Sequence, residues 1–367
     1  MPLKTLILLF ACALVSVAVG QQTQSSTQFS ESKGYTPRHP SEIYLNYKPK
    51  KEKVEKDAPA AVEVPAVTLR ASILNAGRVP VTGLDASEFK LFVDDVETPI
   101  ASVESKTEPV NLILVLDISP STTMTTKDIA ERSFRIVEQL GPGDRAMVVK
   151  FATDMKVVSD LTEDRAATRK AIEKALDRMV SGTSIYDTVR NLSEKTFRAI
   201  PGRKVAVFIT DGVDTTSTRA NYETSLMAAE KSDAAFFVVY LNTLSGVKNA
   251  MAAVNPTLGL PIPPLGFPTV NPKTMQHDYQ IGMKYLDDLI FLSGGRPVIG
   301  NDPSDPMFQI IDEIRQQYVI TFKPSGQNFP GDRHQIKLRV IRPGLTVRTR
   351  GSYIVPEIEL KSAGEKK

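Results

Sequence analysis

The sequence predicts an α/β fold, a doubly wound and mostly parallel sheet with helices on both faces, flanked by a small antiparallel β-sandwich-like domain. Residues 110–116 and 205–209 are predominantly apolar runs, and such runs alternate along the chain with helical patterns. They are typical of strands that are buried on both faces of a parallel sheet. Nearer the two ends, short stretches alternate apolar and polar residues with a period of two, which is typical of antiparallel strands.

The N-terminal segment has the pattern of a secretory signal peptide. Lys4 precedes the apolar run 5–19, and small residues end this run at Gly20. We therefore expect cleavage after Gly20 and a mature chain that is secreted, periplasmic or at the cell surface. Residues 21–60 are polar and lack periodicity, so we expect a disordered tether there and a disordered tail at 356–367.

The composition limits the classes of function. The chain carries 45 basic and 42 acidic residues, a near-neutral balance that argues against general nucleic-acid binding. Cys12 is the single cysteine and lies inside the signal segment, so we expect the core, not disulfides, to stabilise the mature protein. After the signal, no stretch has the ~20 apolar residues of a transmembrane helix, so we expect no membrane span in the mature chain.

The flanking segments, residues 61–107 and 317–355, carry the period-two pattern with Gly, Pro and Asn turns between the stretches. Roughly 45 residues in the first segment are too few for a complete sandwich. We therefore expect the two segments to fold together as one small β-sandwich, with the central domain, residues 108–316, inserted between them.

The central domain alternates predicted strands and helices, as a doubly wound sheet requires. The predicted strands lie at 110–117, 146–151, 155–160, 205–210, 234–241 and 297–299. The predicted helices lie near 125–140, 163–179, 185–199, 219–231, 279–293 and 304–316.

Residues 243–272 contain repeated prolines and several glycines. Proline removes a backbone donor and breaks regular elements, so we expect a surface insertion here. Two interpretations stay open for it: a contact role, favoured by its apolar residues, and a variable loop without function.

Oxygen-bearing side chains stand in three predicted loops. One carboxylate and two hydroxyls directly follow the strand at 110–117, a threonine lies in a glycine-containing loop, and a second carboxylate follows the strand at 205–210. Open α/β sheets bind ligands at the carboxyl ends of their strands, and such oxygens suit a hard divalent cation. The spacing predicts a metal site formed by Asp117, Ser119, Ser121, Thr183 and Asp211.

Each of these residues, taken alone, also fits a structural role. Ser119 and Ser121 suit the cap of a helix that begins near residue 125, and Thr183 suits the N-cap of a helix that begins at 185. Asp211 suits an ordinary turn after a strand. Only their joint occurrence favours the metal site.

The three parts, in this order, resemble the metal-ion-dependent adhesion site (MIDAS) of von Willebrand factor type A domains, written Asp-x-Ser-x-Ser, then Thr, then Asp. The resemblance spans roughly residues 108–317. It implies that the five residues above bind a divalent cation, Mg²⁺ or else Ca²⁺ or Mn²⁺. The flanking segments resemble those of bacterial exported proteins that place such a domain between β-rich pieces.

Two carboxylates and three hydroxyls leave part of a six-oxygen shell to water. The resemblance implies that an Asp or Glu of a partner protein replaces one such water. We therefore expect an extracytoplasmic protein-binding or adhesion module that is not an enzyme.

Two alternatives stay open, a metal-dependent hydrolase or phosphotransferase and a scaffold with a structural metal. Catalysis near a metal usually needs a general base. The histidines, His39, His277 and His334, lie in the tether, at the edge of the insertion and in a predicted strand. A phosphotransferase that uses a strand-end Asp as nucleophile generally needs a second carboxylate two residues further on, where this chain has Ser119.

Overall fold

The computed structural model describes residues 66–244, 272–298, 310–324 and 331–355. Its central sheet has six strands in the order β10-β9-β8-β5-β6-β7. All neighbours are parallel except β6 and β7, which form an antiparallel pair. The strands are β5 (Val110–Asp117), β6 (Arg145–Phe151), β7 (Met155–Thr162), β8 (Arg203–Thr210), β9 (Ala234–Tyr240) and β10 (Pro297–Val298). The doubly wound, mostly parallel sheet predicted from the sequence is confirmed.

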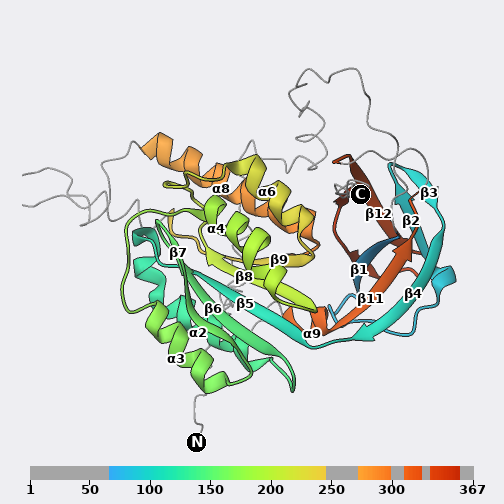
Figure 1. The fold of residues 1–367 in the computed structure, drawn as a ribbon, viewed down its shortest axis with the longest axis horizontal. Coiled ribbons are helices and arrows are strands. Elements are labelled where there is room, and N and C mark those ends of the chain that lie inside the picture. Colours follow the sequence, from blue (N-terminus) through green and yellow to red (C-terminus); the bar gives the residue numbers. More distant parts are fainter. Residues whose placement is uncertain (1–65, 245–271, 299–309, 325–330, 356–367) are drawn as a thin grey trace, which may run out of the picture. The chain divides into compact units, whose positions relative to one another are not determined.

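Helices cover both faces of this sheet (Figure 1). One face packs against α2 (Thr126–Glu138), α3 (Arg165–Ala175) and α9 (Ile310–Arg315), which share a core with alternate residues of β5 and β8. The helices on the other face are α4 (Ile185–Asn191), α5 (Phe197–Ala199), α6 (Tyr222–Lys231) and α8 (Pro272–Ser293). Every residue of β5 is buried, as expected for a strand covered on both faces.

Short irregular turns adjoin two of these helices. A 3₁₀ turn, Pro120–Thr125, precedes α2, and a π-helical turn, Leu192–Thr196, joins α4 to α5. The helix predicted near 279–293 begins earlier, at Pro272, where proline suits the first helical turn. His277 therefore lies in a helix, and the prediction that the irregular insertion reaches residue 272 is wrong at that end. Residues 245–271 lie outside the described residues.

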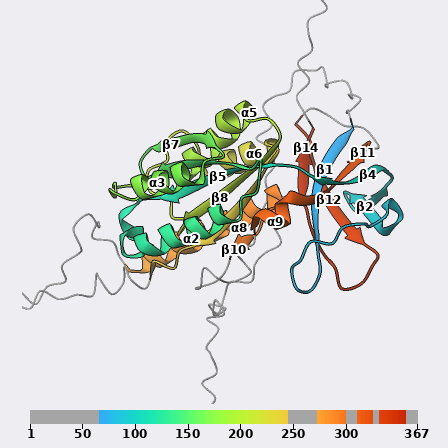
Figure 2. The same ribbon diagram turned by 90° about the horizontal axis from the view of Figure 1, so that it is seen from below.

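Two four-stranded sheets arise from the flanking segments, in the orders β13-β1-β11-β4 and β14-β12-β2-β3. Strands from the N-terminal segment are β1 (Val67–Leu74), β2 (Phe89–Val93), β3 (Val96–Thr98) and β4 (Ile100–Thr107). Those from the C-terminal segment are β11 (Gln316–Phe322), β12 (Arg333–Val340), β13 (Thr346–Arg348) and β14 (Ser352–Ile354). Figure 2 shows blue β1 beside red β11, far apart in sequence yet paired in antiparallel register.

The two sheets share one apolar core, in which Leu69 and Leu91 of the first segment pack with Ile320 and Leu338 of the second. Neither segment could bury this face alone. The predicted joint folding of the two segments is therefore what the structure shows, while the boundaries at 61–107, 108–316 and 317–355 stay predictions.

Buried carboxylates tie this β-sandwich to the α/β domain. Arg333 of β12 donates from Nε to both oxygens of Glu230 at 2.9 Å, and from Nη2 to Oε2 at 2.6 Å. Glu313 of α9 accepts from Arg296 at 2.6 Å and from Arg348 at 3.2 Å. These buried charges are each matched by an opposite charge, as burial requires.

Candidate metal centre

The two predicted carboxylates lie at the same edge of the central sheet. Asp117 is the last residue of β5, and Asp211 directly follows β8. The two strands are parallel neighbours in which Leu116 pairs with Ile209. The side chains reach the carboxyl edge together because parallel strands in register end at the same level.

Asp117 is fully buried, and both of its carboxylate oxygens accept hydrogen bonds. Oδ1 accepts from the backbone N–H of Ser119 at 2.9 Å, and Oδ2 accepts from the Thr210 hydroxyl at 2.5 Å. A carboxylate has about four lone-pair positions. Asp117 therefore retains acceptor capacity for a further ligand.

The two serines after Asp117 stand beside each other. The hydroxyl oxygens of Ser119 and Ser121 are 3.1 Å apart. Helix α2 starts after Thr125, with no side-chain capping hydrogen bond, so the alternative role of these serines as caps of that helix is not what the structure shows. Thr122 fixes the loop instead, because its hydroxyl donates to the carbonyls of Asp117 and Ser119.

Thr183 lies in a loop that is tied to the loop after β8. Its backbone N–H donates to the Thr215 hydroxyl at 2.9 Å, and its carbonyl accepts from the N–H groups of Thr215 and Thr216 at 2.8 and 3.0 Å. Its neighbour Ser184, not Thr183, is the N-cap residue of α4. The same loop contacts the start of the Ser119 loop, since Val180 N–H donates to Ile118 at 3.0 Å.

Gly182 permits this close approach of loops. Its φ of +83° is unfavourable for other residues, and a Cβ there would lie 2.7 Å from the Thr153 hydroxyl and 2.8 Å from a Thr216 methyl. The Gly-Thr pair recognised in the sequence therefore has a steric reason: the glycine lets Thr183 be held between the loops after β6 and β8.

Asp211 is also buried, and its oxygens accept hydrogen bonds from groups that the sequence reasoning missed. Oδ2 accepts from the Thr243 hydroxyl at 2.6 Å and from the Tyr279 hydroxyl at 3.2 Å. Thr243 was expected to belong to a surface insertion, but it is 3% exposed and belongs to this site. Thr243 follows β9, the next strand of the sheet, and this position could have predicted that it lies at the carboxyl edge. No pattern in the sequence could have predicted the same for Tyr279 on α8.

Asp187 and Asp214 were left out of the predicted ligand set, and each has local backbone partners. Asp187 accepts from three consecutive N–H groups, residues 218–220. Asp214 accepts from the N–H groups of Tyr186 and Ser217. Both carboxylates thus stabilise the loops around Thr183.

Burial and the neighbouring carboxylate act on the charge of Asp117. Burial is the larger cause and Asp211 the second, and together they raise the pKa of Asp117 to about 7. The donors Ser119 and Thr210 oppose this rise. The pKa of Tyr279 is also raised, by burial first and then by Asp211.

The donor set fits a divalent cation. Within the described ranges, hydroxyl and backbone N–H groups donate to these two carboxylates, and no Lys, Arg or His forms an ion pair with either. Two buried carboxylates this close are unfavourable unless a proton or a cation compensates them. The described residues hold no cluster of three or more His, Cys, Asp or Glu that could bind a metal, so any ion here would need the hydroxyls as ligands.

A mostly parallel six-stranded sheet with helices on both faces defines the class of doubly wound α/β domains, and one known family of this class matches the chain. Residues 111–253 match the family model of the von Willebrand factor type A domain. The chain therefore contains a von Willebrand factor type A domain, as its motifs indicated. No curated protein sequence matches the chain.

Several solved structures resemble this chain at low sequence identity. BatB, a conserved hypothetical protein of Bacteroides thetaiotaomicron, is 19% identical over 56% of this chain and 97% of its own, with a TM-score of 0.38. A von Willebrand factor type A protein of Catenulispora acidiphila is 14% identical over 83% of this chain and 76% of its own, with a TM-score of 0.39.

Proximal thread matrix protein 1 from the mussel byssus, described with a zinc-occupied MIDAS motif, is 15% identical over 62% of this chain and 50% of its own, with a TM-score of 0.41. Because all three TM-scores are low, we rest the identification on the family match and on the site geometry.

Proposed function

We propose that this protein is an extracytoplasmic binding module that captures an acidic residue of a partner protein through a divalent cation. The observation that carries the proposal is the pair of buried carboxylates, Asp117 and Asp211, at one sheet edge, where no Lys, Arg or His of the described residues forms an ion pair with them. The family match supports it, because type A domains with this motif bind divalent metals and protein partners.

The proposed ligands are Asp117, Ser119, Ser121, Thr183 and Asp211, with Mg²⁺ as the cation and Ca²⁺ or Mn²⁺ as substitutes. When bound, the cation would supply a Lewis-acidic position for a carboxylate oxygen of the partner. Asp117 and Asp211 would neutralise its charge, and the paired serine hydroxyls would add oxygens without adding charge. Because the protein itself would supply only two negative charges, the cation would still attract the carboxylate of a partner.

The surrounding residues hold the ligands in place. Thr210 orients Asp117, while Thr243 and Tyr279 orient Asp211. Such partners fix the position of metal ligands and raise affinity. Because these three groups come from β8, the segment after β9 and α8, the site depends on the packing of several elements.

A catalytic role is the second candidate, and the described residues give it no support. His334 lies in the β-sandwich, where its Nδ1 is 2.7 Å from Asp94, and His277 lies in α8. Neither is among the groups that contact Asp117 or Asp211 in the described ranges.

The signal-like segment 1–20 supports export, and no described helix is long and apolar enough to cross a membrane.

The first test is metal binding, measured by calorimetric titration of the full chain with Mg²⁺ and with Mn²⁺. We expect one saturable site, lost in Asp117→Ala and in Asp211→Ala. The matched control is Asp177→Ala, since Asp177 is exposed. Equal affinity in all four proteins would exclude the proposed ligand set.

The second test is carboxylate capture. Mn²⁺-loaded protein enhances the relaxation of water protons through exchangeable bound water. We expect a short peptide with one Asp to reduce this enhancement and the matched Asn peptide to leave it unchanged. If metal binds but neither peptide has an effect, the site is structural and the recognition proposal is wrong.

A further inference from the structure

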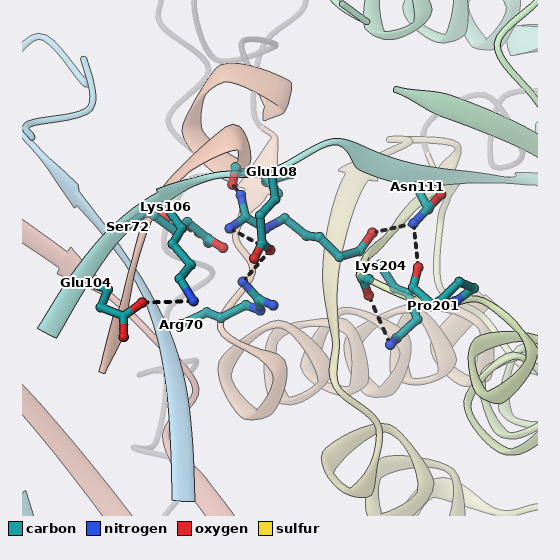
Figure 3. A network of polar contacts seen from close by, with 12 residues as sticks. Arg70, Ser72, Glu104, Lys106, Glu108, Asn111, Pro201 and Lys204 are labelled. Atoms are coloured by element: carbon teal, nitrogen blue, oxygen red, sulfur yellow. Dashed lines mark hydrogen bonds and ion pairs between the residues drawn. The ribbon is translucent and has the colours of Figure 1, made fainter. Parts of the chain in front are cut away.

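A basic cavity lies at the opposite end of the central strands, where β8 and β9 begin. Its lining includes Arg70 of β1, Arg203 and Lys204 of β8, Asp233 before β9, and Arg350. Figure 3 shows a network of polar contacts that includes Lys204 and the ion pair between Arg70 and Glu108. We call this cavity, with these five lining residues, the basic cavity.

Arg203 is buried without a full set of acceptors. Its side chain is 2% exposed. Nη1 donates to the carbonyl of Ile314, and Nη2 is 3.4 Å from Glu108 Oε2, an ion pair without hydrogen-bond geometry. Among the described residues, neither Nε nor Nη2 has a hydrogen-bond partner. Buried donors without acceptors are rare because each one costs desolvation energy. The Arg203 guanidinium is therefore a candidate to bind a ligand that supplies the missing acceptors.

Arg350 repeats the pattern from another element. Its Nη2 donates to the carbonyl of Thr68 at 3.1 Å, while its buried Nε has no partner in the part of the chain that the structure describes. Two guanidinium groups that line one cavity therefore both have N–H groups left to donate. A guanidinium presents five donors in a fixed plane, which suits oxyanions.

The charges around the cavity do not balance. Four lining residues are cationic, and Asp233 is the acidic residue among the described lining. Glu108 adds a second carboxylate, but it is shared between Arg70 at 2.9 Å and Arg203 at 3.4 Å. Burial, and then the nearby charge of Arg70, lower the pKa of Arg203 to about 10. This excess of positive charge would be relieved by an anion.

From these contacts we propose that the basic cavity binds a small tetrahedral oxyanion, of the chemical class of phosphate and sulfate. The cavity volume is about 40 Å³. A cavity of roughly 10–15 Å³, measured in the same way, holds one water, so this cavity has room for a few waters or for one such anion. Donors from β1, β8 and Arg350 approach from different elements, which suits a tetrahedral ligand better than a planar carboxylate.

The test uses the full chain in a chloride buffer with chelator, so that no metal at the other end contributes. Inorganic phosphate and sulfate are titrated by calorimetry, with acetate at equal ionic strength as comparison. We expect one saturable site for which phosphate and sulfate compete, and no saturable binding of acetate. Absence of saturable phosphate and sulfate binding would overturn the proposal, as would tighter binding of acetate.

Variants locate the site. Arg350→Gln removes a group with an unpartnered donor, and we expect about a tenfold loss of phosphate affinity. Lys204→Gln removes charge at a half-buried position, and we expect a severalfold loss. The matched control, Arg198→Gln, changes an exposed arginine that does not line the cavity, and its affinity should equal that of the unchanged protein.

Arg203→Gln is the most direct change, but Arg203 also holds the carbonyl of Ile314. The fold of the Arg203→Gln variant is therefore checked by circular dichroism. If this variant does not fold, the Arg350 and Lys204 variants decide the proposal. Phosphate affinity that is unchanged in both of those variants would place the anion elsewhere and contradict the proposal.

Discussion

The two ends of the central strands carry opposite charges that the described residues do not balance. At the carboxyl end, Asp117 and Asp211 are buried with hydroxyl and N–H donors alone. At the amino end of the same β8, Arg203 is buried with donors left unpartnered. Elsewhere, buried charges such as Glu230 and Glu313 each have arginine partners. An uncompensated buried charge, of either sign, therefore marks a place for a ligand.

The largest expected effect is a dependence of metal-free stability on pH. The pKa of Asp117 is raised from 3.8 to about 7 in the folded chain, so the folded state binds more protons than the unfolded state between these values. The free energy of unfolding should therefore be highest below pH 4 for this group and fall as pH rises to 7, by on the order of 4 kcal/mol.

This dependence is measured by urea unfolding with chelator from pH 4 to pH 8, and Asp117→Asn is the control. We expect the variant to lose most of the decline, and Mg²⁺ to restore the stability of the unchanged protein at pH 8. The prediction is wrong if the free energy of unfolding rises from pH 4 to pH 8 in the unchanged protein but not in the variant. That result would mean that other groups of the protein already stabilise the charged form of Asp117.

The next effect concerns the packing behind the acidic end. A Cβ at Gly282 of α8 would lie 2.5 Å from the carbonyl oxygen of Gly212, the residue after Asp211. Gly282→Ala should therefore destabilise the protein by about 3 kcal/mol and weaken Mg²⁺ binding. Gly77→Ala, where a Cβ meets one side-chain atom at 3.3 Å, is the matched control in urea unfolding. Equal stability of the two variants would mean that α8 does not position Asp211.

A smaller effect is expected from Thr210→Val, which keeps the shape of the side chain and removes the hydroxyl that donates to Asp117. Loss of a hydrogen bond to a charged group should weaken Mg²⁺ binding about tenfold. Calorimetric titration measures it, and Thr162→Val at the end of β7 tests for a general effect of the substitution. An unchanged affinity in Thr210→Val would remove this threonine from the supporting shell.

The smallest effect tests the basic end. Asp233→Asn removes the acidic group of the described lining, so phosphate should bind about threefold to tenfold more tightly, because one repulsive charge is lost. Asp177→Asn, at an exposed position outside the lining, is the control. Weaker phosphate binding in Asp233→Asn would show that Asp233 orients the lining arginines instead of repelling the anion.

The carboxyl end could be anticipated because its signals are local in sequence. Asp117 and Asp211 directly follow runs that read as buried strands, and Gly182 and Thr183 stand together in one loop. Parallel strands in register then bring these loops to one edge. Thr243 was placed in an insertion because prolines dominate the residues after it, and Tyr279 carried no signal because its partner is distant in sequence.

The succession of strands and helices, the doubly wound sheet and the chemical types of the proposed ligands could all be predicted from sequence, because apolar periodicity and strand-end polar residues are local patterns. Packing of the whole domain, in contrast, sets which hydroxyls orient Asp117 and Asp211, and brings Arg70, Arg203 and Arg350 to one cavity. Those contacts join segments far apart along the chain, and burial, which sets the cost of an unpartnered charge, exists only once the segments pack together.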